Sequence, residues 1–142
     1  MKLDVSVRVF SEGGHERHIV VEHVDQLPAL VDQLAAEDTG SAIITHQDRP
    51  RWNEQGPDHE LVVAFGTDGR AALSYWDGET PRHYSRGSGP AVEGWEDENI
   101  APPADAWVSR NVVERALEEF LRTAQRPTVV EWQPDPFPLP GL

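Results

Sequence analysis

The sequence predicts a single α+β domain in which a mostly antiparallel sheet is covered on one face by two helices. Apolar and polar residues alternate in several short segments, whereas in two longer segments the apolar residues recur at three- and four-residue spacing. The resulting order is β-β-α-β-β-β-β-α-β, and two helices on one face of such a sheet would bury both of their apolar stripes. With 142 residues, the chain has room for one core of ordinary size and not for two.

A hairpin and a helix are expected first. Residues 3–10 alternate between apolar and polar, as a half-buried strand does, and residues 17–22 are the expected returning strand. Two adjacent glycines between them favour a turn, because glycine adopts positive φ readily. The helix is expected to begin near Asp25 as its N-cap and to stop near Gly40. Its apolar face comprises Leu27, Leu30, Val31, Leu34 and Ala35.

Four further strands are expected in the middle of the chain, at residues 42–45, 61–65, 71–76 and 82–85. The pair Asp68-Gly69 is a turn signal that joins the second and third of them. Residues 47–58 are polar, contain proline and glycine, and are expected to form a loop. Trp95 lies in a candidate short strand, which an acidic, proline-containing loop follows at residues 96–105.

The second helix has the clearest pattern in the sequence. Ser109 is a suitable N-cap, and Pro127 disfavours a helical conformation in the residue before it. The closing strand is expected at residues 128–132, so the domain spans residues 1–133. Residues 134–142 contain four prolines and are expected to form an extended tail. The apolar face of the helix comprises Val112, Val113, Ala116, Leu117, Phe120 and Leu121.

Acidic residues dominate the charged side chains. The chain holds 25 Asp and Glu against 12 Lys and Arg, a formal net charge of −13. Such a charge repels phosphate backbones and attracts basic proteins, so a basic protein partner is favoured over direct nucleic-acid binding. Solubility alone is the simpler explanation of the same charge. The absence of cysteine excludes disulfides, thiolate metal ligands and a cysteine nucleophile. No signal-peptide pattern and no uncharged apolar run of about 18–20 residues is present, which predicts a soluble, cytoplasmic protein without membrane contact.

No catalytic, metal or cofactor site is expected. The chain lacks a Gly-x-Ser-x-Gly nucleophile motif, and the glycine-rich segment 87–89 lacks the lysine and the following helix of a phosphate-binding loop. His15, His18 and His23 come closest to a metal-ligand cluster, but no carboxylate pair stands at a fixed spacing around them. We interpret these histidines as exposed polar residues.

Five tryptophans are many for a chain of this length. Trp76, Trp107 and Trp132 are expected to fill the core between the sheet and the helices. Trp52 and Trp95 lie beside charges in predicted loop or strand-end positions, where a large aromatic side chain favours protein binding. For Trp52, packing in the core is an equal alternative.

Residues 94–132 carry a run of aromatic, acidic and helix-ending motifs. In order, these are Gly94-Trp95-Glu96, an acidic proline-containing loop, Ala106-Trp107-Val108-Ser109, Phe120-Leu121-x-Thr123-x-x-Arg126-Pro127 and Val130-Glu131-Trp132. This run resembles the Imm1 family of bacterial immunity proteins, and the earlier segments fit the general layout of that family. The resemblance implies a cytoplasmic, non-enzymatic antidote that binds a polymorphic toxin, often a nucleic-acid deaminase or nuclease. It carries over no contact residues, because immunity interfaces diverge with their toxins.

The expected partner is therefore a basic toxin whose substrate channel the acidic chain would occupy. A toxin that acts on nucleic acid needs a positively charged channel, in which carboxylates can stand where phosphates would bind. Charge reversal at Glu96 and Asp97 is expected to slow association and to weaken its salt dependence. The expected contact residues are Trp95, Glu96, Asp97 and Glu98 in the acidic loop, then Asp77 and Glu79 on a neighbouring turn, and Trp52.

Two other functions remain open at the level of sequence. An adaptor or secretion chaperone would expose a large apolar groove and would bind an unfolded client better than a folded one. A metal-dependent enzyme acting through the histidines would retain stoichiometric zinc after dialysis. The identity of the toxin, the choice between its active site and an exosite, and the oligomeric state are open as well.

Overall fold

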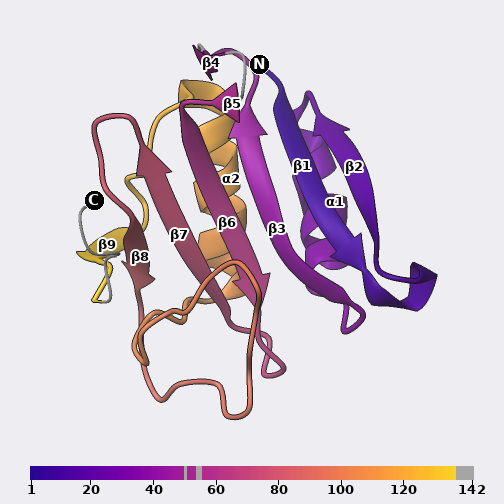
Figure 1. Cartoon of the computed structure of the whole chain (residues 1–142), viewed down its shortest axis with the longest axis vertical. Helices are drawn as coiled ribbons and strands as arrows, with labels where there is room; N and C mark the ends of the chain where they lie inside the picture. Colours follow the sequence, from indigo (N-terminus) through magenta and orange to yellow (C-terminus); the bar gives the residue numbers. More distant parts are fainter. Residues whose placement is uncertain (50, 54–55, 137–142) are drawn as a thin grey trace.

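The computed structural model describes residues 1–49, 51–53 and 56–136 and confirms the α+β fold (Figure 1). Within this part of the chain, seven strands form one antiparallel sheet in the order β2-β1-β3-β6-β7-β8-β9. A separate two-stranded ladder joins β4 (Arg51–Asn53) to β5 (Gly56–Pro57). The strands of the large sheet are β1 (Leu3–Val9), β2 (His15–Val21), β3 (Thr39–His46), β6 (His59–Phe65), β7 (Ala71–Asp77), β8 (His83–Arg86) and β9 (Glu131–Pro134).

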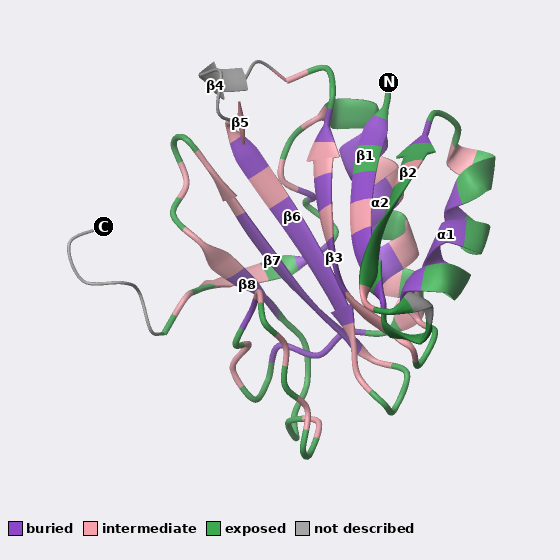
Figure 2. Ribbon diagram, turned by 45° about the vertical axis from the view of Figure 1, so that its right-hand side comes forward, coloured by how far each residue is buried: buried purple, intermediate pink, exposed green. Residues whose placement is uncertain are grey.

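Both helices lie on the same face of the large sheet, as predicted (Figure 1). α1 (Leu27–Leu34) packs beside α2 (Arg110–Thr123), and together they cover the inward side chains of the strands. Figure 2 shows the consequence for burial, since the central strand β6 is mostly buried while the edge strand β2 is mostly exposed. Fully buried members of this core include Leu3, Val5, Leu30, Val31, Leu73, Leu117 and Phe120.

The ends of the helices follow local hydrogen bonding. The hydroxyl of Ser109 accepts a hydrogen bond from the backbone N–H of Val112, which confirms the predicted N-cap of α2. α1 begins two residues after Asp25, because Val24–Gln26 form a 3-10 turn. Gly40 does not stop this helix. The helix ends at Leu34, Gly40 belongs to β3, and the hydroxyl of Thr39 donates to the carbonyls at the helix end.

Several predicted boundaries shift by a few residues. The predicted strands 82–85 and 128–132 are found as β8 and β9, one and three residues later at their starts. The predicted loop 47–58 contains the short strands β4 and β5, and Trp95 does not lie in a strand. β9 reaches Pro134, one residue past the predicted domain boundary, and residues 137–142 of the predicted tail lie outside the described part.

A long loop, residues 87–106, covers part of the opposite face of the sheet and forms a second core there. In Figure 1 it crosses in front of the lower ends of β6 and β7, whereas both helices lie behind. The base of the loop is closed by backbone hydrogen bonds from Gly87 to Asp105 and from Ser88 to Trp107. The second core comprises Val62, Ala64, Ala72, Tyr84, Ile100, Ala106 and Trp107.

Tight contact at the base of the loop explains a glycine. A Cβ atom on Gly87 would stand 1.9 Å from the carbonyl oxygen of Trp107, so only glycine permits the two backbones to approach this closely.

The three tryptophans predicted to fill the core between the sheet and the helices lie in different places. Trp107 is buried, but in the second core and not between the sheet and the helices. Trp132 is partly buried against the helix-side core, as expected. Trp76 is only half-buried and lies on the face away from the helices, because its neighbour Tyr75 faces them.

Candidate protein-binding site

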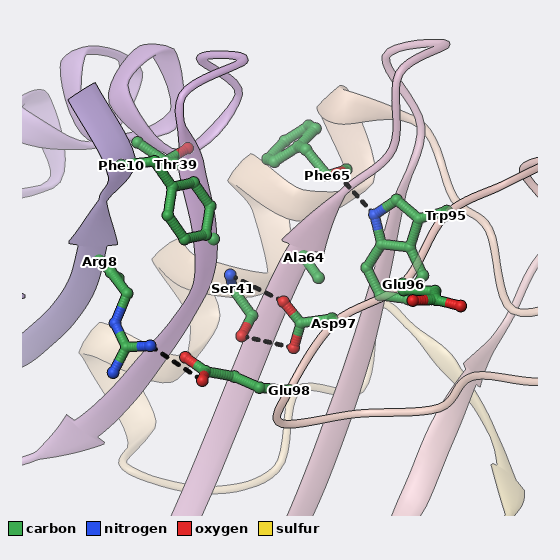
Figure 3. Close-up of a pocket in the computed structure, with 11 residues that line it drawn as sticks. Arg8, Phe10, Thr39, Ser41, Ala64, Phe65, Trp95, Glu96, Asp97 and Glu98 are labelled. Carbon is green, nitrogen blue, oxygen red and sulfur yellow. Dashed lines mark hydrogen bonds and ion pairs between the residues drawn. The ribbon is translucent and has the colours of Figure 1, made fainter. Parts of the chain in front are cut away.

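The acidic segment 95–98 borders a hollow at one end of the sheet (Figure 3). The hollow has a volume of about 200 Å³. Its other walls come from the end of β1, the beginning of β3 and the end of β6. The site therefore joins four chain segments that are far apart in the sequence, and the 87–106 loop supplies its acidic side.

Asp97 attaches this loop to the sheet. Its carboxylate accepts hydrogen bonds from the backbone N–H of Ser41 at 3.1 Å, from the Ser41 hydroxyl at 2.8 Å and from the backbone N–H of Asn99 at 2.8 Å. The Asn99 side chain in turn donates to the Ser41 hydroxyl at 2.7 Å. These bonds hold the loop against the beginning of β3, so Asp97 positions its neighbours and its carboxylate is already engaged within the chain.

Trp95 forms a fixed wall of the hollow. Its indole N–H donates to the carbonyl of Phe65 at 3.2 Å, and its ring meets the ring of Trp107 edge-on with centroids 5.1 Å apart. The side chain is half-buried between the second core and the hollow. Trp95 therefore offers one face to a partner, while its polar atom is engaged by the end of β6.

Glu96 and Glu98 are the exposed acidic groups of this segment. Glu98 accepts a hydrogen bond at 2.9 Å from Arg8 on β1, and the two side chains are 56% and 44% exposed. Within the described part of the chain, the Glu96 carboxylate has neither a hydrogen bond nor an ion pair. Of the three acidic residues, Glu96 is thus the one whose charge is most accessible to a partner.

The second predicted group, Asp77 and Glu79, lies at the other end of the sheet. The seven residues of β7 separate the two places, about 20 Å at the usual rise of a strand. Asp77 accepts hydrogen bonds from the Tyr75 hydroxyl at 2.8 Å and from the backbone N–H of Glu79 at 2.9 Å. Burial alone would raise the pKa of Asp77, but these hydrogen bonds outweigh it and lower that pKa. The Glu79 side chain is exposed.

The structure thus separates the predicted contact residues instead of gathering them. Trp95, Glu96, Asp97 and Glu98 line one side of the same hollow, whereas Asp77 and Glu79 form a distant turn. Trp52 lies on β4, and its side chain is outside the described part.

Sequence reasoning missed Phe10. This side chain was assigned to the first strand, but it lies one residue past β1, in a short 3-10 turn, and is 56% exposed. It lines the same hollow as Trp95 and Glu96. The two glycines that follow Phe10 after two residues, at 13 and 14, were a signal that the strand turns early, because both adopt positive φ.

Sequence reasoning also missed a buried polar network at the C-terminal end of α2. Arg49 donates to both carboxylate oxygens of Asp58 at 2.9 Å and to the carbonyl of Ala124 at 3.0 Å. His59 bonds Asp58 at 2.9 Å and accepts from the backbone N–H of His46 at 2.8 Å. The bidentate Arg49 contact lowers the pKa of Asp58, and burial lowers the pKa of His59. This network satisfies carbonyls at the end of α2, and its side chains are no more than 20% exposed.

The histidines that were considered as metal ligands do not converge. His15, His18 and His23 are all exposed, in agreement with the prediction. No group of three or more His, Cys, Asp or Glu side chains in the described residues is arranged to hold a metal ion.

Across the same residues, every helix is too short or too polar to span a membrane.

Comparison with known proteins assigns a family to this geometry. The family model described as immunity protein Imm1 matches residues 15–134, which include both helices and most of the sheet. A search of curated proteins finds no match. The match covers the whole 87–106 loop and three of the four walls of the hollow, leaving out only the end of β1. Because the matched region spans most of the chain, this protein belongs to the Imm1 family of immunity proteins, whose members protect against a toxin.

Proposed function

We propose that this chain neutralises a toxin that acts on nucleic acid, by binding the toxin and covering its basic substrate channel without any reaction of its own. Family membership supports immunity against a toxin. The net charge of −13 supports a basic channel as the contact surface of the toxin. A toxin of this kind must attract phosphates and will therefore attract an acidic protein.

The observation that carries the proposal is the fixed acidic loop. Asp97 ties the segment to Ser41, so that Glu96 and Glu98 are presented at the rim of the hollow without further ordering. A surface that is ordered before binding loses less conformational entropy in the complex, which favours tight association. Two carboxylates held in this way can take the positions of two phosphates in a basic channel.

The turn at Asp77 and Glu79 is the second candidate for the contact surface. Asp77 is engaged with Tyr75 and lies 4.0 Å from Arg49, so its charge is partly compensated within the chain. Glu79 alone is freely exposed there. The loop at 95–98 is therefore the stronger candidate, and variants at the two ends of the sheet distinguish the two surfaces.

Co-expression tests the proposed function. We expect this chain to restore growth of cells that produce its cognate toxin, and to form a one-to-one complex with the purified toxin at a Kd on the order of nanomolar or below. A short nucleic-acid substrate should compete with the chain for the toxin. Complex formation without such competition would point to an exosite and would contradict the proposed mechanism.

The two alternative functions give different results in the same samples. A secretion chaperone or adaptor would bind the unfolded toxin better than the folded toxin, whereas an antidote prefers the folded toxin. A metal-dependent enzyme would retain stoichiometric zinc after dialysis against a chelator. Preference for the unfolded toxin, or retained zinc together with loss of protection when zinc is removed, would contradict the proposal.

A further inference from the structure

Phe10 is an exposed aromatic ring held at the rim of the hollow. It is 56% exposed and directly follows Val9, the buried last residue of β1. The backbone N–H of Phe10 donates to the carbonyl of Asp38 at 2.7 Å, which fixes the turn against the beginning of β3. The ring lies over Gly40, where an added Cβ would be 3.5 Å from the tip of the ring. The chain thus supports this ring while leaving much of it in contact with solvent.

The charges around the hollow do not balance. Its walls carry one cation, Arg8, and three carboxylates (Figure 3). Asp97 is engaged with Ser41, Glu98 with Arg8, and Glu96 has no cationic partner among the described residues. The Arg8–Glu98 pair is solvent-exposed on both sides, and such pairs contribute little, so Glu98 can exchange Arg8 for another cation.

We propose that this hollow binds a single arginine or lysine side chain from the toxin's substrate channel, a proposal that rests on the proposed function. The cation would contact the face of the Phe10 ring and pair with Glu96 at the rim, and the exposed side of Trp95 would form the wall behind it. The hollow, of about 200 Å³, has room for several water molecules, which an entering basic side chain would displace.

This pocket would add specificity to a general attraction between acidic and basic surfaces. Charge alone steers many basic proteins towards an acidic one, but it selects poorly among them. A basic side chain that must enter between an aromatic ring and a carboxylate requires the toxin to present it at one position. Phe10 and Glu96 are therefore the residues we expect to distinguish the cognate toxin from other basic proteins.

Affinity measurements with the purified toxin test the pocket. We expect Phe10→Ala and Glu96→Gln each to raise the Kd about tenfold or more. Phe10→Leu retains apolar area but lacks the aromatic face, so we expect it also to weaken binding, by at least about threefold. Val129→Ala and Glu131→Gln are matched controls, because both side chains are exposed at the opposite edge of the sheet, and their Kd should stay within about twofold of wild type. All variants should keep the melting temperature of wild type, since the changed side chains are exposed.

A double-mutant cycle identifies the bound side chain. Each arginine and lysine of the toxin channel is replaced by glutamine, and each toxin variant is measured against the wild-type chain and against Glu96→Gln and Phe10→Ala. We expect one toxin variant for which Glu96→Gln and Phe10→Ala have little further effect, because the shared contact is already lost.

Two kinds of failure are distinguishable. If the wild-type chain neither protects against the toxin nor binds it, the proposed function fails and the pocket proposal falls with it. If the wild-type chain protects and binds, but the Phe10 and Glu96 variants stay within about twofold of wild type, the pocket proposal alone is overturned. The same holds if no basic residue of the toxin shows coupling to Phe10 or Glu96.

Discussion

Asp97 and Glu96 are adjacent in the sequence and serve different purposes in the structure. The carboxylate of Asp97 accepts three hydrogen bonds from Ser41 and Asn99, whereas the carboxylate of Glu96 has no partner in the described part of the chain. A sequence of acidic residues does not reveal this difference, because it depends on which side chain faces β3. Charge reversal at both residues together would therefore change the loop conformation as well as the surface charge.

Asp97→Asn is expected to loosen the loop. The amide group that replaces one carboxylate oxygen is a donor, and it would face donors on Ser41 and Asn99 instead of accepting from them. We expect the free energy of local opening to fall by about 1–2 kcal/mol, measured by hydrogen exchange at the amides of Ser41 and Asn99. Glu96→Gln is the control and should leave these exchange rates unchanged. Unchanged rates in Asp97→Asn would contradict the anchoring role.

His59 is expected to make the fold less stable in mild acid. Burial lowers the pKa of His59 below its ordinary value of 6.5, so below that pH the unfolded chain binds a proton that the folded chain does not. Stability should therefore be constant above about pH 6.5 and should fall as the pH decreases through the folded-state pKa. Asp58 and Asp77, whose pKa values are lowered in the fold, should add a second loss below about pH 3.8.

Urea unfolding between pH 8 and pH 5 measures the contribution of His59. His59→Gln should lower stability throughout but should remove most of the decrease between pH 6.5 and pH 5, because glutamine does not titrate. His18→Gln, at an exposed position on β2, serves as the control and should retain the decrease. A His59→Gln variant with the wild-type pH dependence would assign the effect to another group.

At the scale of elements, α2 combines a clear local signal with a specific tertiary role. Its N-cap Ser109 follows Trp107 and Val108, whose backbones bond Ser88 at the base of the loop and Ala71 on β7. Its C-terminal end meets Arg49 and His46, which bond the carbonyls of Ala124 and Leu121. The helix thus spans the distance between the base of the 87–106 loop and the buried polar network.

Ser109→Ala should measure the contribution of the cap. The hydroxyl of Ser109 accepts from the backbone N–H of Val112, and alanine would leave that group without its side-chain partner. We expect a loss of about 1 kcal/mol in the free energy of unfolding, determined by denaturant titration. Ser88→Ala, at an exposed position of the loop, is the control and should change stability by less than about 0.5 kcal/mol. Equal effects in the two variants would exclude a specific capping contribution.

At the scale of the whole molecule, charge is the property most relevant to binding. A net charge of −13 accelerates encounter with a basic partner, and salt screens this attraction over about 8–10 Å at ordinary ionic strength. The long-range part depends on total charge, whereas the short-range part depends on where individual carboxylates lie. Reversal of a single charge at the contact surface should therefore affect binding more than the same reversal elsewhere.

Glu96→Lys should lower the association rate with the toxin and reduce its dependence on salt concentration. The change alters the net charge by two units at the rim of the hollow, where an approaching basic surface would meet it. Glu79→Lys alters the net charge equally at the other end of the sheet and should have a smaller effect. Stopped-flow association at several salt concentrations compares the two. A larger effect of Glu79→Lys would transfer the contact surface to the 77–79 turn.

Local sequence patterns were sufficient for the α+β class, for both helices and for all seven strands of the large sheet. Period-two and period-3.6 patterns report which residues face a core, and the caps and turns at Ser109, Asp68 and Gly69 are decided within a few residues. The acidic loop and its tryptophan were also recognisable, because exposed carboxylates beside an aromatic residue are visible in composition alone. The early end of the first strand, and with it the exposure of Phe10, was not recognised.

Tertiary structure alone decided how these parts meet. The second core under the 87–106 loop, the approach of Gly87 to Trp107 and the attachment of Asp97 to Ser41 each join segments that are distant in the sequence. The hollow between Phe10 and Glu96 also joins distant segments. The tertiary structure likewise sets the distance between the acidic segment 95–98 and the turn at residues 77–79. Strand order determines these contacts. It depends on how the whole sheet packs, and no single segment of the sequence contains that information.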